Sequence, residues 1–190
     1  MDPDGLIFAC AMGVEERIAR RLGPTVRVGL GASSGIPGEG RLVSFGVAGA
    51  LKHGLEIGTV IDATRVVDEN GKVLWEGAPL GVSPAVTGTI LGASRIIDDP
   101  AERAELYESS GAEAVDMESG PLARAGRLAG CIRAISDTPD RELAGLAEGL
   151  RLDGDIDYVG LARGFLRAPR DTARAARDAR RALKSLEAVA

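Results

Sequence analysis

Short apolar runs typical of buried strands alternate along this chain with segments that favour helices. Residues 6–11 are continuously apolar, as in a strand buried on both faces, and residues 15–22 follow as a helix. Further strands are predicted at residues 25–30, 42–47 and 58–67. This alternation predicts an α/β fold, a three-layer α-β-α sandwich around a mixed, mostly parallel sheet. With 190 residues, the chain is expected to form a single domain over residues 1–190.

Turn and cap residues refine this outline. A turn at residues 69–71, followed by the run 72–75, predicts a hairpin. Asp99 and Pro100 are expected to begin a helix that ends at Gly111. Further on, a helix is predicted from Glu142 and a turn at 153–155.

The connection between the second and third predicted strands is short for a parallel crossover. Only residues 35–41 separate the second predicted strand and its glycine-rich end from the third. A parallel crossover usually needs a dozen residues or more, with a helix among them. The sequence therefore predicts a shortened scaffold at this point.

Two polar blocks follow predicted strands. Residues 115–119 read Val-Asp-Met-Glu-Ser after a short strand at 111–115 and before a helix at 119–128, and residues 133–137 read Arg-Ala-Ile-Ser-Asp in the next strand. In open α/β sheets, ligands bind at the carboxyl ends of strands. Both blocks are therefore expected to face one small site.

Together, the two blocks resemble the purine nucleoside phosphorylase and nucleosidase superfamily, and within it the hopanoid-associated phosphorylases. Residues 42–49, 98–119 and 164–169 extend this likeness. The resemblance implies cleavage of the N-glycosidic bond of an adenine nucleoside, adenosylhopane in hopanoid lipid biosynthesis. It leaves water or phosphate as the acceptor, so phosphate is a candidate co-substrate. The alternatives are a methylthioadenosine or adenosylhomocysteine nucleosidase, and a non-catalytic nucleoside-binding relative.

The resemblance also implies roles for residues of the two blocks. Asp137 is the candidate general acid for the departing purine, and Ser136 is expected to orient it. Glu118 is expected to accept hydrogen bonds from the ribose hydroxyls, with Met117 against the sugar. Arg133 is interpreted as a structural partner that holds the two carboxylates apart. The plainer alternatives are a strand-end cap for Asp137, a helix-start carboxylate for Glu118 and core filling for Met117.

The N-terminal strand-to-helix turn contains a further candidate. Glu15 matches the glutamate that activates water in hydrolytic relatives, although Glu16 beside it leaves the register open by one residue. A solvated glutamate at a helix start is the plain alternative. For phosphorolysis, the glycine-rich residues 29–35 are the candidate anion site, because such turns can direct several N–H groups at a phosphate.

Two other loops are expected to border the nucleoside. Gly46, Ala48 and Gly49 resemble a turn in relatives where the backbone approaches the nucleoside, which glycine permits. Ile96 aligns with a loop whose backbone borders the purine, and Arg95 stands where relatives often have a stacking aromatic residue.

Composition narrows the range of partners. A net charge of −5 argues against a general nucleic-acid binder, because binding to phosphates needs clustered cations. The single His53 and the absence of metal-ligand spacing in the sequence predict no metal and no cofactor. Cys10 and Cys131, without a secretory leader, predict a cytoplasmic protein with reduced thiols.

The C-terminal region is locally basic. Its cations recur at intervals of four and three, which would align them on one helical face: Arg163, Arg167, Arg170, Arg174, Arg177, Arg181 and Lys184. A solvated face is the plain interpretation. The alternative is peripheral contact with an anionic inner membrane, which would suit a lipid-linked nucleoside. The family resemblance further implies a homodimer.

Overall fold

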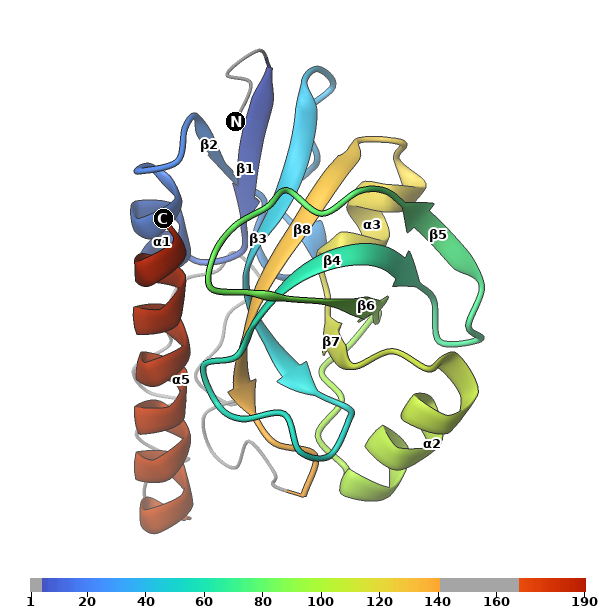
Figure 1. Ribbon diagram of the computed structural model, residues 1–190, viewed down its shortest axis with the longest axis vertical. Coiled ribbons are helices and arrows are strands. Elements are labelled where there is room, and N and C mark those ends of the chain that lie inside the picture. The colour runs from blue at the N-terminus through green and yellow to red at the C-terminus, as the bar shows by residue number, and fades with distance from the viewer. Residues whose placement is uncertain (1–4, 141–167) are drawn as a thin grey trace.

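The computed structural model describes residues 5–140 and 168–190, and the predicted helix from Glu142 and turn at 153–155 lie outside them (Figure 1). The first half of the chain contains β1 (Leu6–Cys10), α1 (Gly13–Ala19), β2 (Thr25–Arg27), the short 3-10 helix η1 (Leu30–Ala32), β3 (Arg41–Ala50), β4 (Val60–Val67), β5 (Val73–Glu76) and β6 (Val86–Gly92). The second half contains α2 (Pro100–Ser110), β7 (Ala114–Asp116), α3 (Ser119–Arg124), β8 (Leu128–Asp137) and α5 (Pro169–Val189).

The strands form one mixed sheet that closes on itself. Along its main path the order is β2-β1-β3-β7-β6-β4-β5, and β8 pairs with both β3 and β4. The pairs β1–β2, β1–β3, β3–β8, β4–β6 and β6–β7 are parallel, while β3–β7, β4–β5 and β4–β8 are antiparallel. The predicted α/β fold with a mixed, mostly parallel sheet is confirmed. Because β3, β7, β6, β4 and β8 pair in succession and return to β3, they also form a ring that the sequence pattern does not reveal.

Helices lie on both sides of the sheet. In Figure 1, α5 runs along one side together with α1, and α2 and α3 lie on the other. On the first side, Phe8 and Phe45 pack edge to face with centroids 5.9 Å apart, in a core that includes Ala182 and Leu186 of α5. On the α3 side, Leu122 joins a second apolar core. Each face of the sheet is thus buried, which explains the continuously apolar strands.

The short crossover is made without an α-helix. β2 and β3 are separated in the sheet by β1, and residues 28–40 connect them through η1 alone. Val28, Ala32 and Ile36 from this connection pack into the core that contains Leu122. The loop therefore covers the part of the sheet where a longer crossover would place a helix, as the shortened scaffold predicts.

Several boundaries differ from the sequence prediction; the strand predicted at residues 25–30, for example, ends at Arg27, and Leu30 begins η1. Residues 46–49, expected in a turn, lie inside β3, because this strand continues to Ala50 along β8. The helix predicted at residues 119–128 ends at Arg124, where Gly126 takes a left-handed conformation (φ 67°) and turns the chain into β8. Strand β6 was not predicted, since its exposed start and its glycines hide the usual alternation.

Other local predictions hold. Asp99 caps α2 through a hydrogen bond from Glu102 N, and Gly111 ends the helix in a left-handed conformation. Cys10 and Cys131 are free and buried. Within residues 5–140 and 168–190, no helix has the length and apolar character needed to cross a membrane.

Candidate active site

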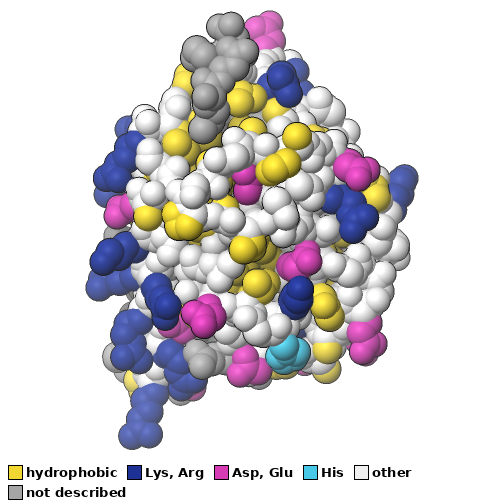
Figure 2. All heavy atoms as spheres, viewed as in Figure 1, with side chains coloured by type: hydrophobic (Ala, Val, Ile, Leu, Met, Phe, Trp, Pro, Cys, Tyr) yellow, Lys and Arg dark blue, Asp and Glu magenta, His cyan; other side chains and the backbone are white. Residues whose placement is uncertain are grey.

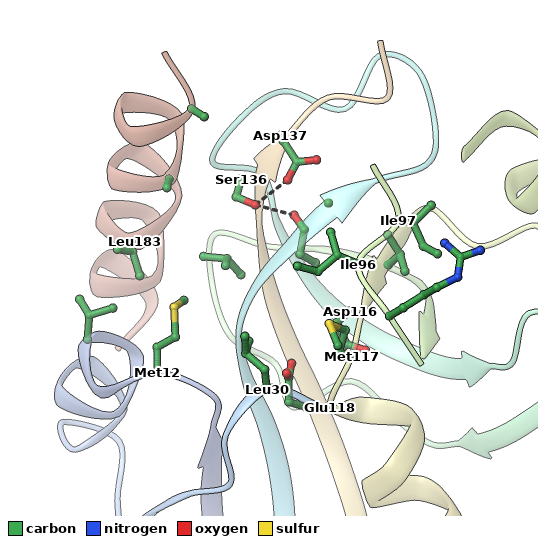
Figure 3. A pocket seen from close by; sticks show the side chains of 18 of the residues that line it. Met12, Leu30, Ile96, Ile97, Asp116, Met117, Glu118, Ser136, Asp137 and Leu183 are labelled. Carbon is green, nitrogen blue, oxygen red and sulfur yellow. Dashed lines mark hydrogen bonds between the residues drawn. The ribbon is translucent and has the colours of Figure 1, made fainter. Parts of the chain in front are cut away.

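A cavity of about 300 Å³ lies at the carboxyl ends of β3, β7 and β8 and is bounded by α1, α5 and the loop after β6. Both polar blocks reach it. Figure 3 shows Ser136 and Asp137 at one end and Met117 and Glu118 toward the other. Residues 19 positions apart in the chain, Glu118 and Asp137, reach the same cavity because β7 and β8 both flank the end of β3.

At one end of the cavity, the two carboxylate oxygens of Asp137 have different neighbours. Ser136 Oγ lies 2.8 Å from Asp137 Oδ2 and 3.2 Å from Ala48 O. A hydroxyl has one proton and donates to one of these acceptors at a time. When Ser136 donates to Ala48 O, its oxygen is free to accept the proton of a protonated Asp137. The pair can therefore hold Asp137 in either protonation state.

The other oxygen of Asp137 faces a buried cation that the sequence did not reveal. Arg103, from α2, is 1% exposed, and its Nη1 lies 2.5 Å from Asp137 Oδ1. The same Nη1 donates to Thr138 O at 3.1 Å, and Nε donates to Ile97 O at 3.0 Å. Arg103 has no motif around it in the sequence, and only the fold places it here.

Toward the other end of the cavity lies a charge cluster around Arg133, which is 1% exposed. Arg133 Nη2 lies 2.5 Å from Asp116 Oδ2, 3.2 Å from Glu118 Oε2 and 2.5 Å from Ser44 Oγ. Arg133 is expected to hold Glu118 and Asp137 apart, and the structure differs for one of these two carboxylates. Arg133 contacts Glu118 and Asp116, whereas Asp137 is paired with Arg103. Asp116 also accepts from the N–H and hydroxyl groups of Ser119, which starts α3.

Burial perturbs the protonation of this cluster. Removal from solvent raises the pKa of Glu118 to about 7; the nearby Arg133 opposes the rise, and the charges of Asp116 and Glu15 add to it. The same carboxylates raise the pKa of Arg133, so this side chain stays a cation. One guanidinium thus faces more carboxyl groups than it can neutralise.

Glu15 lies behind the cavity wall and does not line the cavity itself. It is 1% exposed and accepts hydrogen bonds from the N–H groups of Ala11 (3.1 Å), Met12 (2.9 Å) and Val47 (3.0 Å). Met12 and Val47 do line the cavity. Burial raises the pKa of Glu15, against the effect of Arg133. Glu16, by contrast, pairs with Arg20 near the surface, so Glu15 is the inward residue of the two.

Two glycines of β3 make room for the charged residues of β8. In the parallel register, Gly46 lies beside Arg133 and Gly49 beside Asp137. A Cβ at Gly46 would lie 2.7 Å from Arg133 Nη1 and closer still to Glu15, and one at Gly49 would lie 2.9 Å from Asp137 Oδ1. Ala48 and Gly49 line the cavity, whereas Gly46 lies beneath it. These glycines let charged side chains approach the backbone closely.

The glycine-rich loop meets Glu118. Gly31, with a left-handed φ of 60°, donates its N–H to Glu118 Oε1 at 3.0 Å, and Leu30 lines the cavity. The N–H group proposed for an anion is therefore bound to a carboxylate in this structure.

The remaining walls are mostly apolar. Ile96 and Ile97 line the cavity beside Arg95, whose guanidinium binds Glu102 in two hydrogen bonds. Helix α5 adds a further wall that the sequence did not indicate, made by Ala175, Ala176, Ala179 and Leu183. Over the described part of the chain, no group of three or more His, Cys, Asp or Glu side chains could hold a metal ion.

Part of the chain matches a known family. Residues 76–153, which contain β6 to β8 and both polar blocks, match the family model described as Phosphorylase superfamily. No curated protein sequence matches the chain.

Solved structures share the fold at low identity. A mutant of the Helicobacter pylori nucleosidase MTAN with 5′-methylthioadenosine in its active site has 17% identity and a TM-score of 0.57, with 97% of each chain covered. The Campylobacter jejuni 5′-methylthioadenosine/S-adenosyl homocysteine nucleosidase has 17% identity and a TM-score of 0.52, covering 97% of this chain and 99% of that one. Futalosine hydrolase of Helicobacter pylori has 13% identity and a TM-score of 0.52, covering 92% and 96%. At these identities the likeness shows a common fold.

Proposed function

We propose that this chain is an enzyme that cleaves the N-glycosidic bond of an adenine nucleoside. The observation that carries the proposal is the arrangement of the cavity, with Asp137 and Ser136 at one end and Glu118 and Met117 toward the other (Figure 3). A nucleoside placed along the cavity would have its base at Asp137 and its ribose at Glu118. The match of residues 76–153, which include both polar blocks, to the Phosphorylase superfamily model supports the proposed class of enzyme.

The base end supplies the proton. Cleavage expels a purine from a sugar that gains oxocarbenium character, and protonation of the purine ring makes it a better leaving group. Asp137, within reach of Ser136 Oγ at 2.8 Å, is the proposed general acid. Ile96 borders the base from the loop after β6.

The sugar end holds the ribose. An ionised Glu118 can accept from both vicinal hydroxyls, and hydrogen bonds to a charged acceptor are stronger than neutral ones. Since the pKa of Glu118 is about 7 in the free site, hydroxyl donors would favour its ionised form on binding. Met117 covers the sugar beside it.

Water is the proposed acceptor. Among the described residues, Arg95 and Arg103, the cations that line the cavity, face Glu102 and Asp137, and the buried Arg133 faces Asp116 and Glu118. A phosphate would enter beside carboxyl groups without a cation of its own. Glu15 is kept as the candidate that activates the water from the family resemblance; Val47, whose N–H it accepts, lines the cavity, whereas Glu15 itself lies behind the wall.

The apolar wall between α1 and α5 supports a nucleoside with an apolar 5′ substituent. Met12, Leu30, Ala179 and Leu183 all line this part of the cavity. Adenosylhopane, the substrate implied by the resemblance to hopanoid-associated phosphorylases, has such a substituent. 5′-Methylthioadenosine, which occupies the active site of a structural neighbour, is the second candidate. A cytoplasmic location and a homodimer remain predictions from the sequence.

Adenine release tests this proposal. The chain is incubated with adenosylhopane or 5′-methylthioadenosine, with and without phosphate, and adenine is measured. We expect release without phosphate, and a loss of about 10²–10⁴-fold in Asp137→Asn, because an amide cannot donate the carboxyl proton. Asp171→Asn, at an exposed aspartate of α5, is the matched control and should match the wild type.

Other results would change the assignment. An absolute need for phosphate would replace water by phosphate as acceptor. Binding of adenosine without turnover would favour the non-catalytic nucleoside-binding relative. An unchanged rate in Asp137→Asn would remove Asp137 from its role.

A further inference from the structure

Arg103 connects three parts of the candidate site through one buried side chain. It belongs to α2, its Nε binds Ile97 O in the loop after β6, and its Nη1 binds Thr138 O just after β8. The same Nη1 lies 2.5 Å from Asp137 Oδ1. A side chain that is 1% exposed has no freedom to leave these partners without a rearrangement of α2 or the loop.

Asp137 supplies the counter-charge of Arg103 when its carboxyl group is ionised, as it is once the proton has passed to the base. A guanidinium removed from water is unfavourable unless it meets a carboxylate and its N–H groups are hydrogen-bonded. Ile97 O and Thr138 O are neutral acceptors, and Asp137 is the carboxylate in contact. The absence of a side chain at Gly49 leaves the space for this pair, since a Cβ there would lie 2.9 Å from Asp137 Oδ1 and 3.4 Å from Arg103 Nη2.

The two oxygens of Asp137 consequently have different surroundings. Oδ1 faces the Arg103 guanidinium. Oδ2 lies beside the Ser136 hydroxyl, which can donate its proton either to Oδ2 or to Ala48 O. A proton on Asp137 therefore belongs on Oδ2, because a proton on Oδ1 would point at a guanidinium. The contact with Arg103 thus selects one oxygen and one orientation of the carboxyl group.

We propose that Arg103 is a positioning residue for base protonation, acting through Asp137. This inference rests on the proposed function. In the step itself, the O–H bond at Asp137 Oδ2 breaks and an N–H bond forms at a purine ring nitrogen. The electron pair of the glycosidic C–N bond passes to the departing base. Arg103 keeps its charge throughout and stabilises the carboxylate that remains on Asp137, while its hydrogen bond to Ile97 O holds the loop that borders the base.

The test is a double-mutant cycle with two kinds of substrate. Arg103→Gln, Asp137→Asn and the double variant are compared in adenine release. They are also compared on p-nitrophenyl β-D-ribofuranoside, whose leaving group departs without protonation. Arg103→Lys retains the charge, and Arg20→Gln, at an exposed arginine of α1's C-terminal end, is the matched control.

We expect Arg103→Gln to lower kcat for adenine release about 10- to 100-fold with little change in KM, because a displaced acid protonates poorly. In the Asp137→Asn background the same change should have an effect of less than about 2-fold, since residues that act as one unit are not additive. Cleavage of the p-nitrophenyl riboside should stay within about 3-fold of wild type. Arg103→Lys should recover part of the loss.

Several results would overturn the inference. They are an unchanged kcat in Arg103→Gln, an equal loss on both substrates, or full additivity with Asp137→Asn. Thermal unfolding is followed for each variant. If Arg103→Gln does not fold, Arg103→Lys replaces it: a lower kcat with unchanged KM supports the role, and a wild-type kcat rejects it. The wild-type rate tests the proposed function separately, so a chain that releases no adenine contradicts that function and this inference with it.

Discussion

At the scale of single residues, the charge balance around Arg133 is the main determinant of how the site responds to pH. Asp116 and Glu118 contact its guanidinium, and Glu15 lies near enough to influence Glu118 and Arg133. Burial raises the pKa of both Glu118 and Glu15; Arg133 opposes the rise in each case, and for Glu118 the charges of Asp116 and Glu15 add to it. The cluster therefore retains protons that the same residues lose in water.

Because the folded chain keeps the proton of Glu118 to a higher pH, we predict that Glu118 makes the free energy of unfolding depend on pH. The pKa of Glu118 rises from an ordinary 4.5 to about 7 in the folded chain. Between these values the unfolded chain releases a proton that the folded chain keeps, so the free energy of unfolding falls as pH rises. We expect the wild type to lose stability relative to Glu118→Gln over this window, by an amount on the order of 1–3 kcal/mol.

Urea unfolding of both proteins at several pH values measures the difference. Glutamine has a single acceptor oxygen, so the variant can keep the hydrogen bond from Gly31 N or the one from Arg133 but loses the titration, and the comparison therefore uses the slope with pH rather than the absolute stability. Parallel stability curves for the two proteins, or a wild type that gains stability with rising pH relative to the variant, would contradict the assigned shift.

At the scale of elements, α2 is a short helix whose beginning determines where Arg103 lies. Asp99 Oδ1 accepts from Glu102 N at 2.9 Å, and Arg103 N donates to Asp99 O at 3.0 Å. The cap is thus bonded directly to the turn that carries Arg103. Pro100 at the first helical position and Gly111 after the last complete the helix signals.

Removing the cap should loosen this turn. We expect Asp99→Ala to lower the free energy of unfolding by about 1 kcal/mol, because an N–H group of the first turn loses its acceptor. Asp99→Ser, which restores an oxygen acceptor, should lie within a few tenths of a kcal/mol of wild type. Chemical denaturation of the three proteins measures their free energies of unfolding. An equal loss of stability in the alanine and serine variants would show that the cap does not stabilise α2.

Helix α5 has two faces with different properties. One face is apolar, buries Ala182 and Leu186 in the core and lines the cavity with Ala179 and Leu183. The other is exposed and basic, with Arg170, Arg174, Arg177, Arg181 and Lys184. Figure 2 shows Lys and Arg side chains gathered along the edge where α5 lies. The predicted stripe is therefore present from Arg170 onward, while Arg163 and Arg167 lie outside the described residues.

At the scale of the whole molecule, this stripe gives an acidic protein one basic edge, and we predict contact with an anionic membrane there. Each cation near such a surface contributes on the order of 1 kcal/mol, and salt screens the attraction. We expect the wild type to sediment with phosphatidylglycerol-containing vesicles at low salt and to be released at high salt. Replacing the five basic residues of the stripe by glutamine should abolish sedimentation.

Adenine release from a water-soluble nucleoside should remain unchanged in that variant, because the stripe lies on the face of α5 opposite the cavity wall. Arg20→Gln with Arg21→Gln, at exposed positions beside α1, measures the effect of losing two cations outside the stripe. Vesicle binding that persists at high salt, or that the control reduces equally, would count against the stripe.

The closed ring of strands explains why the site forms despite the shortened crossover. Residues 28–40 connect β2 and β3 without an α-helix, yet β3 is bonded to β8 along one edge and to β1 and β7 along the other. The strand that carries Gly46 and Gly49 is thus held on both sides. A missing helix on one face of the sheet leaves this pairing unchanged.

Local patterns in the sequence determined the strands, the cap and end of α2, and the two polar blocks at strand ends, because alternation, capping and turn preferences act over a few residues. These local patterns did not predict strand β6 or the extension of β3 to Ala50, because pairing with neighbouring strands decides those boundaries.

Only the tertiary structure decided which charges meet. Arg103 reaches Asp137 from α2, and Gly31 reaches Glu118 across 87 positions of the chain. α5 closes the cavity from the other end of the sequence. The residues next to a charged side chain in the sequence do not predict its distant partner. The partner is determined by the sheet, which brings the two side chains together. The sequence thus determined which residues could do the chemistry, and the fold determined how they are paired.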